Sequence, residues 1–157
     1  MCVSSCGHDV ALPSGPSDSF DPITFFEGHT HGEGELRKLF AKPVHVSVDG
    51  IGRPVPGGLI LDQTIRKAGE APSTRRWTMR RVGHNSYSGT LSDAVGPVTA
   101  EIVGPRAAIE YSLRHGLKVE QQLSEQPDGK SLLNRLTVHK LGVQVATLTE
   151  TIKKVAP

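Results

Sequence analysis

The strongest constraint in this chain is an alternation of apolar and polar residues in ten short stretches between about Gly28 and Ile152. Gly, Pro, Asp or Asn interrupts it roughly every 8–12 residues, the spacing of turns between short strands. A period of two places alternate side chains on opposite faces of a sheet. Ten such stretches, with no convincing helix between them, predict an antiparallel sheet that closes on itself or folds into a sandwich.

We expect an all-β, antiparallel up-and-down β-barrel of about eight to ten strands. The expected strands cover residues 28–40, 44–51, 59–67, 75–82, 86–91, 98–103, 107–113, 117–125, 131–140 and 143–152. Residues 1–22 are expected to be a mobile N-terminal arm and residues 23–157 the barrel domain. Asp21 and Pro22 suit the start of a short helical turn before the first strand, from which Phe25 and Phe26 would plug one end.

The length, hydrophobic fraction and net charge of the chain argue against some classes of function. The chain has 157 residues, enough for one domain with one core, and 36% of them are hydrophobic. Its net charge of +2 argues against a dedicated nucleic-acid binder. No apolar run reaches the roughly 20 residues that cross a bilayer, so no membrane insertion is expected. The N-terminus lacks a basic start followed by an apolar stretch, which favours the cytoplasm.

The two cysteines, Cys2 and Cys6, lie in the N-terminal segment, so the barrel has no disulfide framework. With His8 they resemble half of a metal site, for which no second pair of ligands follows. We interpret them as incidental thiols and leave their role open. No cofactor is expected, and the oligomeric state stays open between a monomer and a homo-oligomer.

Turns set the expected pairings. The Arg114–Gly116 loop places Tyr111 opposite Val119 and Gln121 diagonal to Tyr111. The Ala68–Thr74 connection places Gln63 near Met79 and Ile65 near Trp77. These pairings predict an apolar inward face interrupted by few polar groups, whereas the opposite face carries charged side chains such as Asp62, Arg76 and Glu120.

Several short motifs follow one another in an order that resembles that of a known protein family. They are Phe25-Phe26-Glu27-Gly28-His29-Thr30-His31-Gly32-Glu33-Gly34, Leu61-Asp62-Gln63, Arg76-Trp77, Gly89-Thr90-Leu91-Ser92-Asp93, Gly96 and Asn134-Arg135. The chain resembles a bacterial family catalogued as a domain of unknown function, number 3833, over most of its length after residue 22. The resemblance implies a lipocalin-like barrel without a settled activity. Many members resemble lipoproteins, but Cys2 and Cys6 here have no apolar segment before them.

The inward polar groups are the main candidate site. The proposed ligand-binding residues are Gln63, Trp77, Met79, Tyr111, Gln121 and Asn134. A few polar groups on an apolar wall fix the orientation of a small hydrophobic ligand, the expected partner. The alternative is a buried network satisfied by its own members and by water.

Two other functions stay open. One is a cofactor-independent isomerase, lyase or cyclase acting on a small hydrophobic substrate in the same cavity, with Tyr111 as acid or donor. The other is an interaction module with a solid core. Asp93 lies in a turn where catalysis can occur, but an Asp that caps the turn is the commoner role.

The histidines suggest a weaker hypothesis. His29 and His31 point the same way on a strand, and with Glu33 they resemble the start of a metal site. Because Glu35 and Arg37 continue that face, we interpret it as solvated and assign no metal. The inward side of the same strand carries Gly32 and Gly34, where glycine permits bending or close approach of another segment. His139, the candidate for single-ligand haem binding, has an outward phase.

The basic run from Arg75 to Arg81 has Trp77 and Met79 on the inward face. Arg76 and Arg80 point outward, which favours a solvated face over a nucleic-acid surface. Arg75 and Arg81 share the phase of Trp77 and are expected at the barrel mouths, where one of them meets an anionic ligand group.

Overall fold

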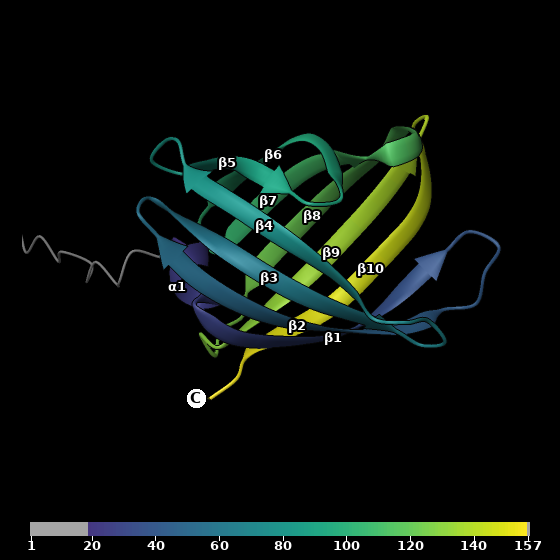
Figure 1. Ribbon diagram of the computed structural model, residues 1–157, viewed down its shortest axis with the longest axis horizontal. Helices are drawn as coiled ribbons and strands as arrows, with labels where there is room; N and C mark the ends of the chain where they lie inside the picture. Colours follow the sequence, from purple (N-terminus) through teal and green to yellow (C-terminus); the bar gives the residue numbers. More distant parts are fainter. Residues whose placement is uncertain (1–18, 157) are drawn as a thin grey trace, which may run out of the picture.

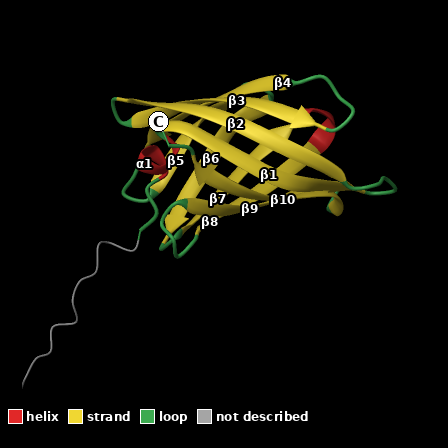
Figure 2. Cartoon of the chain, turned by 90° about the horizontal axis from the view of Figure 1, so that it is seen from below, coloured by secondary structure: helices red, strands yellow, loops and turns green. Residues whose placement is uncertain are grey.

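The computed structural model describes residues 19–156, over which ten strands form one closed antiparallel barrel (Figures 1 and 2). Successive strands pair in order, and β1 also pairs with β10, which closes the sheet. The elements are α1 (Pro22–Phe26), β1 (Gly28–Lys38), β2 (Val44–Val55), β3 (Gly58–Lys67), β4 (Ser73–Arg81), β5 (Ser86–Leu91), β6 (Ala94–Val103), β7 (Arg106–Leu113), a single 3-10 turn (Arg114–Gly116), β8 (Leu117–Glu125), β9 (Ser131–Lys140) and β10 (Val143–Lys154). The predicted up-and-down barrel is confirmed, with ten strands. Within these residues no helix is both long enough and apolar enough to cross a bilayer.

Burial follows the predicted alternation. On β6, Val98 and Ile102 are buried while Glu101 between them is exposed. A shift of one residue in the register would exchange the two faces of a strand, so the alternation locates the core on the inside of the barrel. The charged face predicted from Asp62 and Arg76 lies outside, where the two form an ion pair with Nε–Oδ1 2.6 Å.

The register between β3 and β4 differs from the expected one. The expected pairs, Gln63 with Met79 and Ile65 with Trp77, are wrong, and Gln63 lies opposite Arg75. Strand β4 begins two residues earlier than expected, so the connection from β3 is shorter. The difference in register is an even number of residues, which leaves the same side chains on the inside.

Helix α1 closes one end of the barrel (Figure 1). The Asp21 carboxylate accepts hydrogen bonds from the backbone N–H groups of the first turn, with Ile23 N–Oδ1 3.0 Å, as expected of an N-cap. Phe25 and Phe26 are buried, and so is Phe20, which the boundary at residue 22 assigns to the arm. The rest of the predicted arm, residues 1–18 with both cysteines, lies outside the described residues.

Candidate ligand cavity

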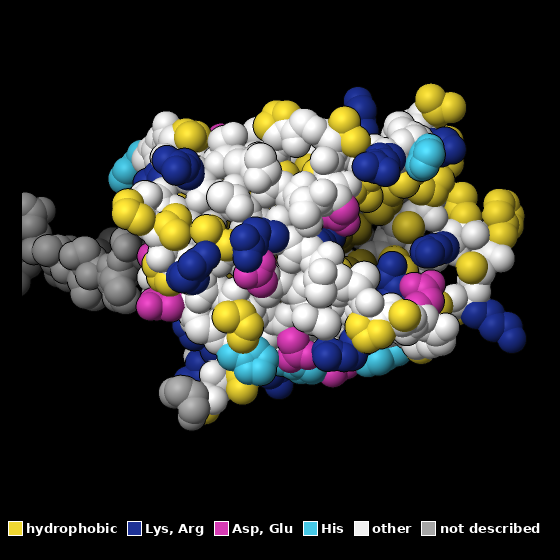
Figure 3. Space-filling view, viewed as in Figure 1, with side chains coloured by type: hydrophobic (Ala, Val, Ile, Leu, Met, Phe, Trp, Pro, Cys, Tyr) yellow, Lys and Arg dark blue, Asp and Glu magenta, His cyan; other side chains and the backbone are white. Residues whose placement is uncertain are grey.

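The interior of the barrel is not filled. It holds a cavity of about 100 Å³ in which the centre of a water molecule can move. One water needs roughly 10–15 Å³ on this measure, so the space accommodates several waters or a compact organic group. Figure 3 shows the barrel hollowed at the end away from α1, with hydrophobic side chains inside. Most lining residues are aliphatic or aromatic, and the side chains with polar groups are Gln63, Arg75, Trp77, Tyr87, Gln121, Asn134 and Glu150.

The first polar group joins β3 and β4 around the amide of Gln63. Its Oε1 accepts hydrogen bonds from Trp77 Nε1 at 2.7 Å and from Arg75 Nε at 3.0 Å. The Arg75 guanidinium carbon lies 5.3 Å from the centre of the Trp77 ring, within the range of a cation–π contact. The Arg75 side chain is 19% exposed, and its Nη1 lies 3.9 Å from Asp93 Oδ2 in the β5–β6 turn. Arg75 therefore extends from the cavity wall to the β5–β6 turn at the rim of the barrel, and its contacts are with Gln63, Trp77 and Asp93.

The second polar group lies on β8, β9 and β10. Glu150 is directly opposite Asn134, and its Oε1 accepts a hydrogen bond from Asn134 Nδ2 at 2.9 Å. Gln121 lies on the next strand, diagonal to Asn134. All three are buried, and one oxygen of each has no hydrogen-bond partner in the described part of the chain: Gln121 Oε1, Asn134 Oδ1 and Glu150 Oε2. Burial raises the pKa of Glu150, although the Asn134 hydrogen bond and the Arg75 charge oppose the shift.

Two glycines of β1 make room for the Glu150 side chain. A Cβ atom on Gly32 would lie 2.5 Å from Glu150 Oε2, and one on Gly34 would lie 2.5 Å from the backbone oxygen of Thr149 and 2.9 Å from Glu150 Cβ. A side chain at Gly32 would displace the carboxylate and one at Gly34 would meet backbone, in agreement with the expectation of close approach on this face. Glu150 was not among the predicted site residues, although it shares the inward phase of Leu148 and Ile152.

The predicted ligand-binding residues are mostly brought together. Those that line the cavity are Gln63, Trp77, Met79, Gln121 and Asn134. Tyr111 is buried beside them but is not part of the lining. Its ring meets Trp77 edge-on, with 5.5 Å between ring centres and an interplanar angle of 89°. Burial raises the pKa of Tyr111, so its hydroxyl stays protonated.

The two arginines expected at the barrel mouths have different positions. Arg75 lines the cavity, whereas Arg81 is exposed and donates from Nη2 to the Tyr87 hydroxyl at 2.8 Å. Arg75 therefore meets the candidate site directly, and Arg81 meets it through Tyr87, which also lines the cavity.

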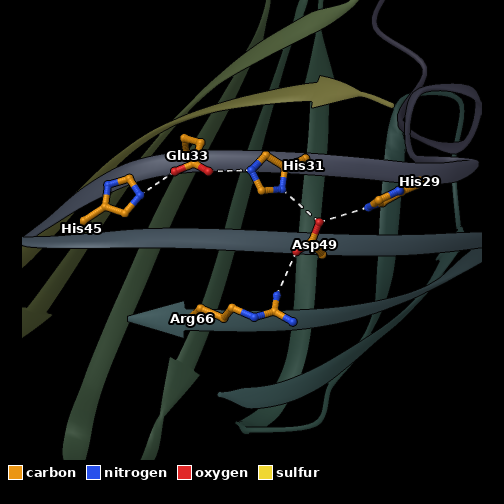
Figure 4. A network of polar contacts seen from close by, with 6 residues as sticks. All are labelled: His29, His31, Glu33, His45, Asp49 and Arg66. Carbon is orange, nitrogen blue, oxygen red and sulfur yellow. Dashed lines mark hydrogen bonds and ion pairs between the residues drawn. The ribbon is translucent and has the colours of Figure 1, made fainter. Parts of the chain in front are cut away.

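A polar network lies outside the barrel on β1, β2 and β3 (Figure 4). It comprises His29, His31, Glu33, His45, Asp49 and Arg66. His31 is central, with Nδ1 2.9 Å from Asp49 Oδ1 and Nε2 2.6 Å from Glu33 Oε1. Within residues 19–156 no three His, Cys, Asp or Glu side chains are arranged to hold a metal ion. The contacts of the network are hydrogen bonds and ion pairs between partly exposed side chains.

We expect His31 to make the stability of the barrel depend on pH. Its hydrogen bonds to Asp49 and Glu33 raise its pKa above the ordinary value of 6.5. A raised pKa in the folded state gives stability that is full below the unfolded value and is lost as pH rises through the folded value. His31→Asn should lower the Tm by about 1–2 °C below about pH 6, and the loss should shrink at higher pH.

Thermal unfolding of both proteins across this pH range provides the measurement. His115→Asn is the matched control, because His115 is exposed in the β7–β8 turn at φ 64°, which asparagine tolerates. A Tm difference for His31→Asn that is the same at every pH would show that the protonated imidazole does not carry the effect.

Comparison with known proteins identifies the family to which the chain belongs. The model of a family described as "Protein of unknown function (DUF3833)" matches residues 1–154. The chain belongs to the DUF3833 family. No curated protein matches it.

Solved structures share the fold of this DUF3833 protein. They include the S-type phycobiliprotein lyase CPES from Guillardia theta (TM-score 0.68, 6% identity, 86% of this chain and 91% of that chain). Rv2717c from M. tuberculosis has a TM-score of 0.67 and 13% identity over 87% of this chain and 99% of that one. A DUF3598 protein of unknown function from Nostoc punctiforme has a TM-score of 0.62 and 14% identity, and the match covers 92% of this chain and 54% of that one. At these identities the similarity establishes a common lipocalin-like barrel.

Proposed function

We propose that this protein binds a small, compact and largely apolar molecule inside its barrel. The observation that carries the proposal is the cavity of about 100 Å³, whose aliphatic and aromatic wall is interrupted by two groups of polar side chains. Cores are normally packed without voids of this size. Burial of apolar ligand surface supplies about 25 cal/mol per Å² before ordering costs, and the polar groups orient the ligand.

A cofactor-independent enzyme using the same cavity is the second candidate. The observation in its favour is Glu150, a buried carboxyl group with a raised pKa on the cavity wall. General acid–base catalysis uses carboxyl groups of this kind. The phycobiliprotein lyase named above shows that this fold accommodates an enzyme.

Filling the cavity should abolish binding. Ala100 lines the cavity, so Ala100→Leu places a larger side chain in the space that a ligand needs. Trp77 is the only tryptophan and also lines the cavity, so its fluorescence reports occupancy. We expect cyclohexylmethanol to change Trp77 emission saturably in the unmodified protein and to bind Ala100→Leu at least roughly tenfold more weakly.

Ala108→Leu is the matched control, because Ala108 is exposed on the adjoining strand β7. It should bind the alcohol as the unmodified protein does. Equal affinity in Ala100→Leu and Ala108→Leu would place the alcohol outside the cavity and contradict the proposal. Native mass spectrometry of freshly purified protein then tests for a carried molecule, and chemical conversion of that molecule would favour the enzyme.

A further inference from the structure

We infer that the ligand of this cavity carries a hydrogen-bond donor, an ammonium group in its strongest form, that docks against Glu150, Asn134 and Gln121. The inference rests on the proposed function and assigns a chemical class to the ligand. Its basis is that three cavity-lining side chains on neighbouring strands each hold a buried oxygen without a hydrogen-bond partner among the described residues.

All three unpartnered atoms are oxygens. The hydrogen bond to Glu150 sets the orientation of the Asn134 amide, because Nδ2 must face the carboxylate and Oδ1 must then face away. Glu150 Oε2 and Gln121 Oε1 also lack donors. Folded proteins pair about 90% or more of their buried polar groups, so three orphaned oxygens on adjacent strands are an exception. A donor group entering between these strands supplies the missing partner.

Among residues 19–156 the Glu150 carboxylate forms no ion pair. Across the cavity on β4, Arg75 acts on it through its charge, but its contacts are with Gln63, Trp77 and Asp93. From β1, His31 and Glu33 act on it with opposite sign, and both belong to the outer network. Within the described residues Asn134 is the one side chain that donates a hydrogen bond to it.

The positions of the Glu150 and Arg75 charges favour one orientation of the ligand in the cavity. The apolar wall takes the hydrocarbon part, and the Glu150 side takes a single cationic group. An ion pair away from water is favourable when both charges are also hydrogen-bonded, and the oxygens of Asn134 and Gln121 meet this condition for an ammonium. Arg75 repels a second cationic group on the other side of the cavity. A neutral hydroxyl donates to the same oxygens without the charge.

Two probes of equal shape test the inference. They are cyclohexylmethylammonium and cyclohexylmethanol, which differ in the charge of the donor and do not absorb where Trp77 emits. At about pH 8 the amine is protonated. We expect the ammonium to bind the unmodified protein at least tenfold more tightly than the alcohol, measured by Trp77 fluorescence.

The variant Glu150→Gln should remove this preference. It keeps the shape of the side chain and abolishes its charge, so the ratio of the two affinities should fall below roughly twofold while the alcohol still binds. Glu120→Gln is the matched control, because Glu120 is exposed on β8 beside Gln121 in sequence and points outward. It should keep the preference of the unmodified protein.

The outcomes separate the two proposals. If the alcohol binds and the ammonium binds no better, or if Glu150→Gln keeps the preference, the inference is overturned and the proposed function stands. If neither probe changes Trp77 emission, the proposed function fails. Lowering the pH should reduce the preference as Glu150 is protonated, whereas Arg75 remains charged throughout.

Discussion

Glu150→Gln is expected to make the unliganded barrel more stable at neutral pH. The carboxylate is 4% exposed, accepts one hydrogen bond and leaves its second oxygen without a partner. A buried charge with incomplete pairing destabilises the folded state, whereas a neutral amide of the same shape has a much smaller desolvation penalty. The expected gain in the free energy of unfolding is about 1–3 kcal/mol.

This gain should depend on pH in a defined direction. Burial raises the pKa of Glu150 above its ordinary value of 4.5, so the folded state holds the proton more tightly than the unfolded state. Stability is therefore full below the unfolded value, falls as pH rises toward the folded value and is constant above it. Glu150→Gln and the unmodified protein should be similarly stable near about pH 4 and diverge above it.

Urea unfolding followed by Trp77 fluorescence measures the effect, with Glu120→Gln as the control that should show no gain that grows with pH. A Glu150→Gln variant that is less stable than the unmodified protein at neutral pH would mean that the carboxylate is well paired. In that case the ammonium inference would lose its basis as well.

The carboxylate of Glu150 is expected to lower the stability of the unliganded barrel and to raise its affinity for the ligand. The gain in affinity explains why a charged residue occupies this buried position. Leu148 and Ile152 on the same face of β10 are apolar, and a barrel optimised for its core alone would continue that pattern. Departures from the local rules of folding concentrate at functional sites. The space left by Gly32 and Gly34 accommodates the departure, so the strand pair β1–β10 is suited to hold a charge inside.

The sequence predicted the architecture well because alternation depends on each strand alone. Ten strands, the inward face and the helical turn that Asp21 caps all follow from local patterns. The register between β3 and β4 does not follow from them. A shift by an even number of residues leaves the alternation unchanged, so the pattern does not distinguish Arg75 from Met79 as the partner of Gln63.

The place of Glu150 in the cavity wall was not predicted from the sequence, for a different reason. Glutamate is seldom buried, so its inward phase between Leu148 and Ile152 carried little weight. The decisive signal is the free space at Gly32 and Gly34, and those residues are more than a hundred positions away in sequence. Only the pairing of β1 with β10, which closes the barrel, brings the glycines and the carboxylate together.

Gly52→Ala should cause a large loss of stability. Gly52 lies on β2 directly under the end of α1, and a Cβ atom there would lie 1.6 Å from the backbone oxygen of Phe26. Backbone cannot yield as a flexible side chain does, so α1 must move away from the barrel. Phe25 and Phe26, both buried in the core cluster, would move with it.

We expect Gly52→Ala to lower the free energy of unfolding by about 2–3 kcal/mol, which corresponds to a urea midpoint lower by roughly 1–2 M. Gly83→Ala is the matched control, because its Cβ would meet Ser86 at 3.4 Å, an ordinary contact, and should leave the midpoint nearly unchanged. The two variants carry the same substitution, so they share its effect on the unfolded chain. Equal midpoints would show that α1 does not close this end of the barrel by packing on Gly52. A selective loss in Gly52→Ala would instead identify the helix as a structural lid whose Phe26 also forms part of the cavity wall.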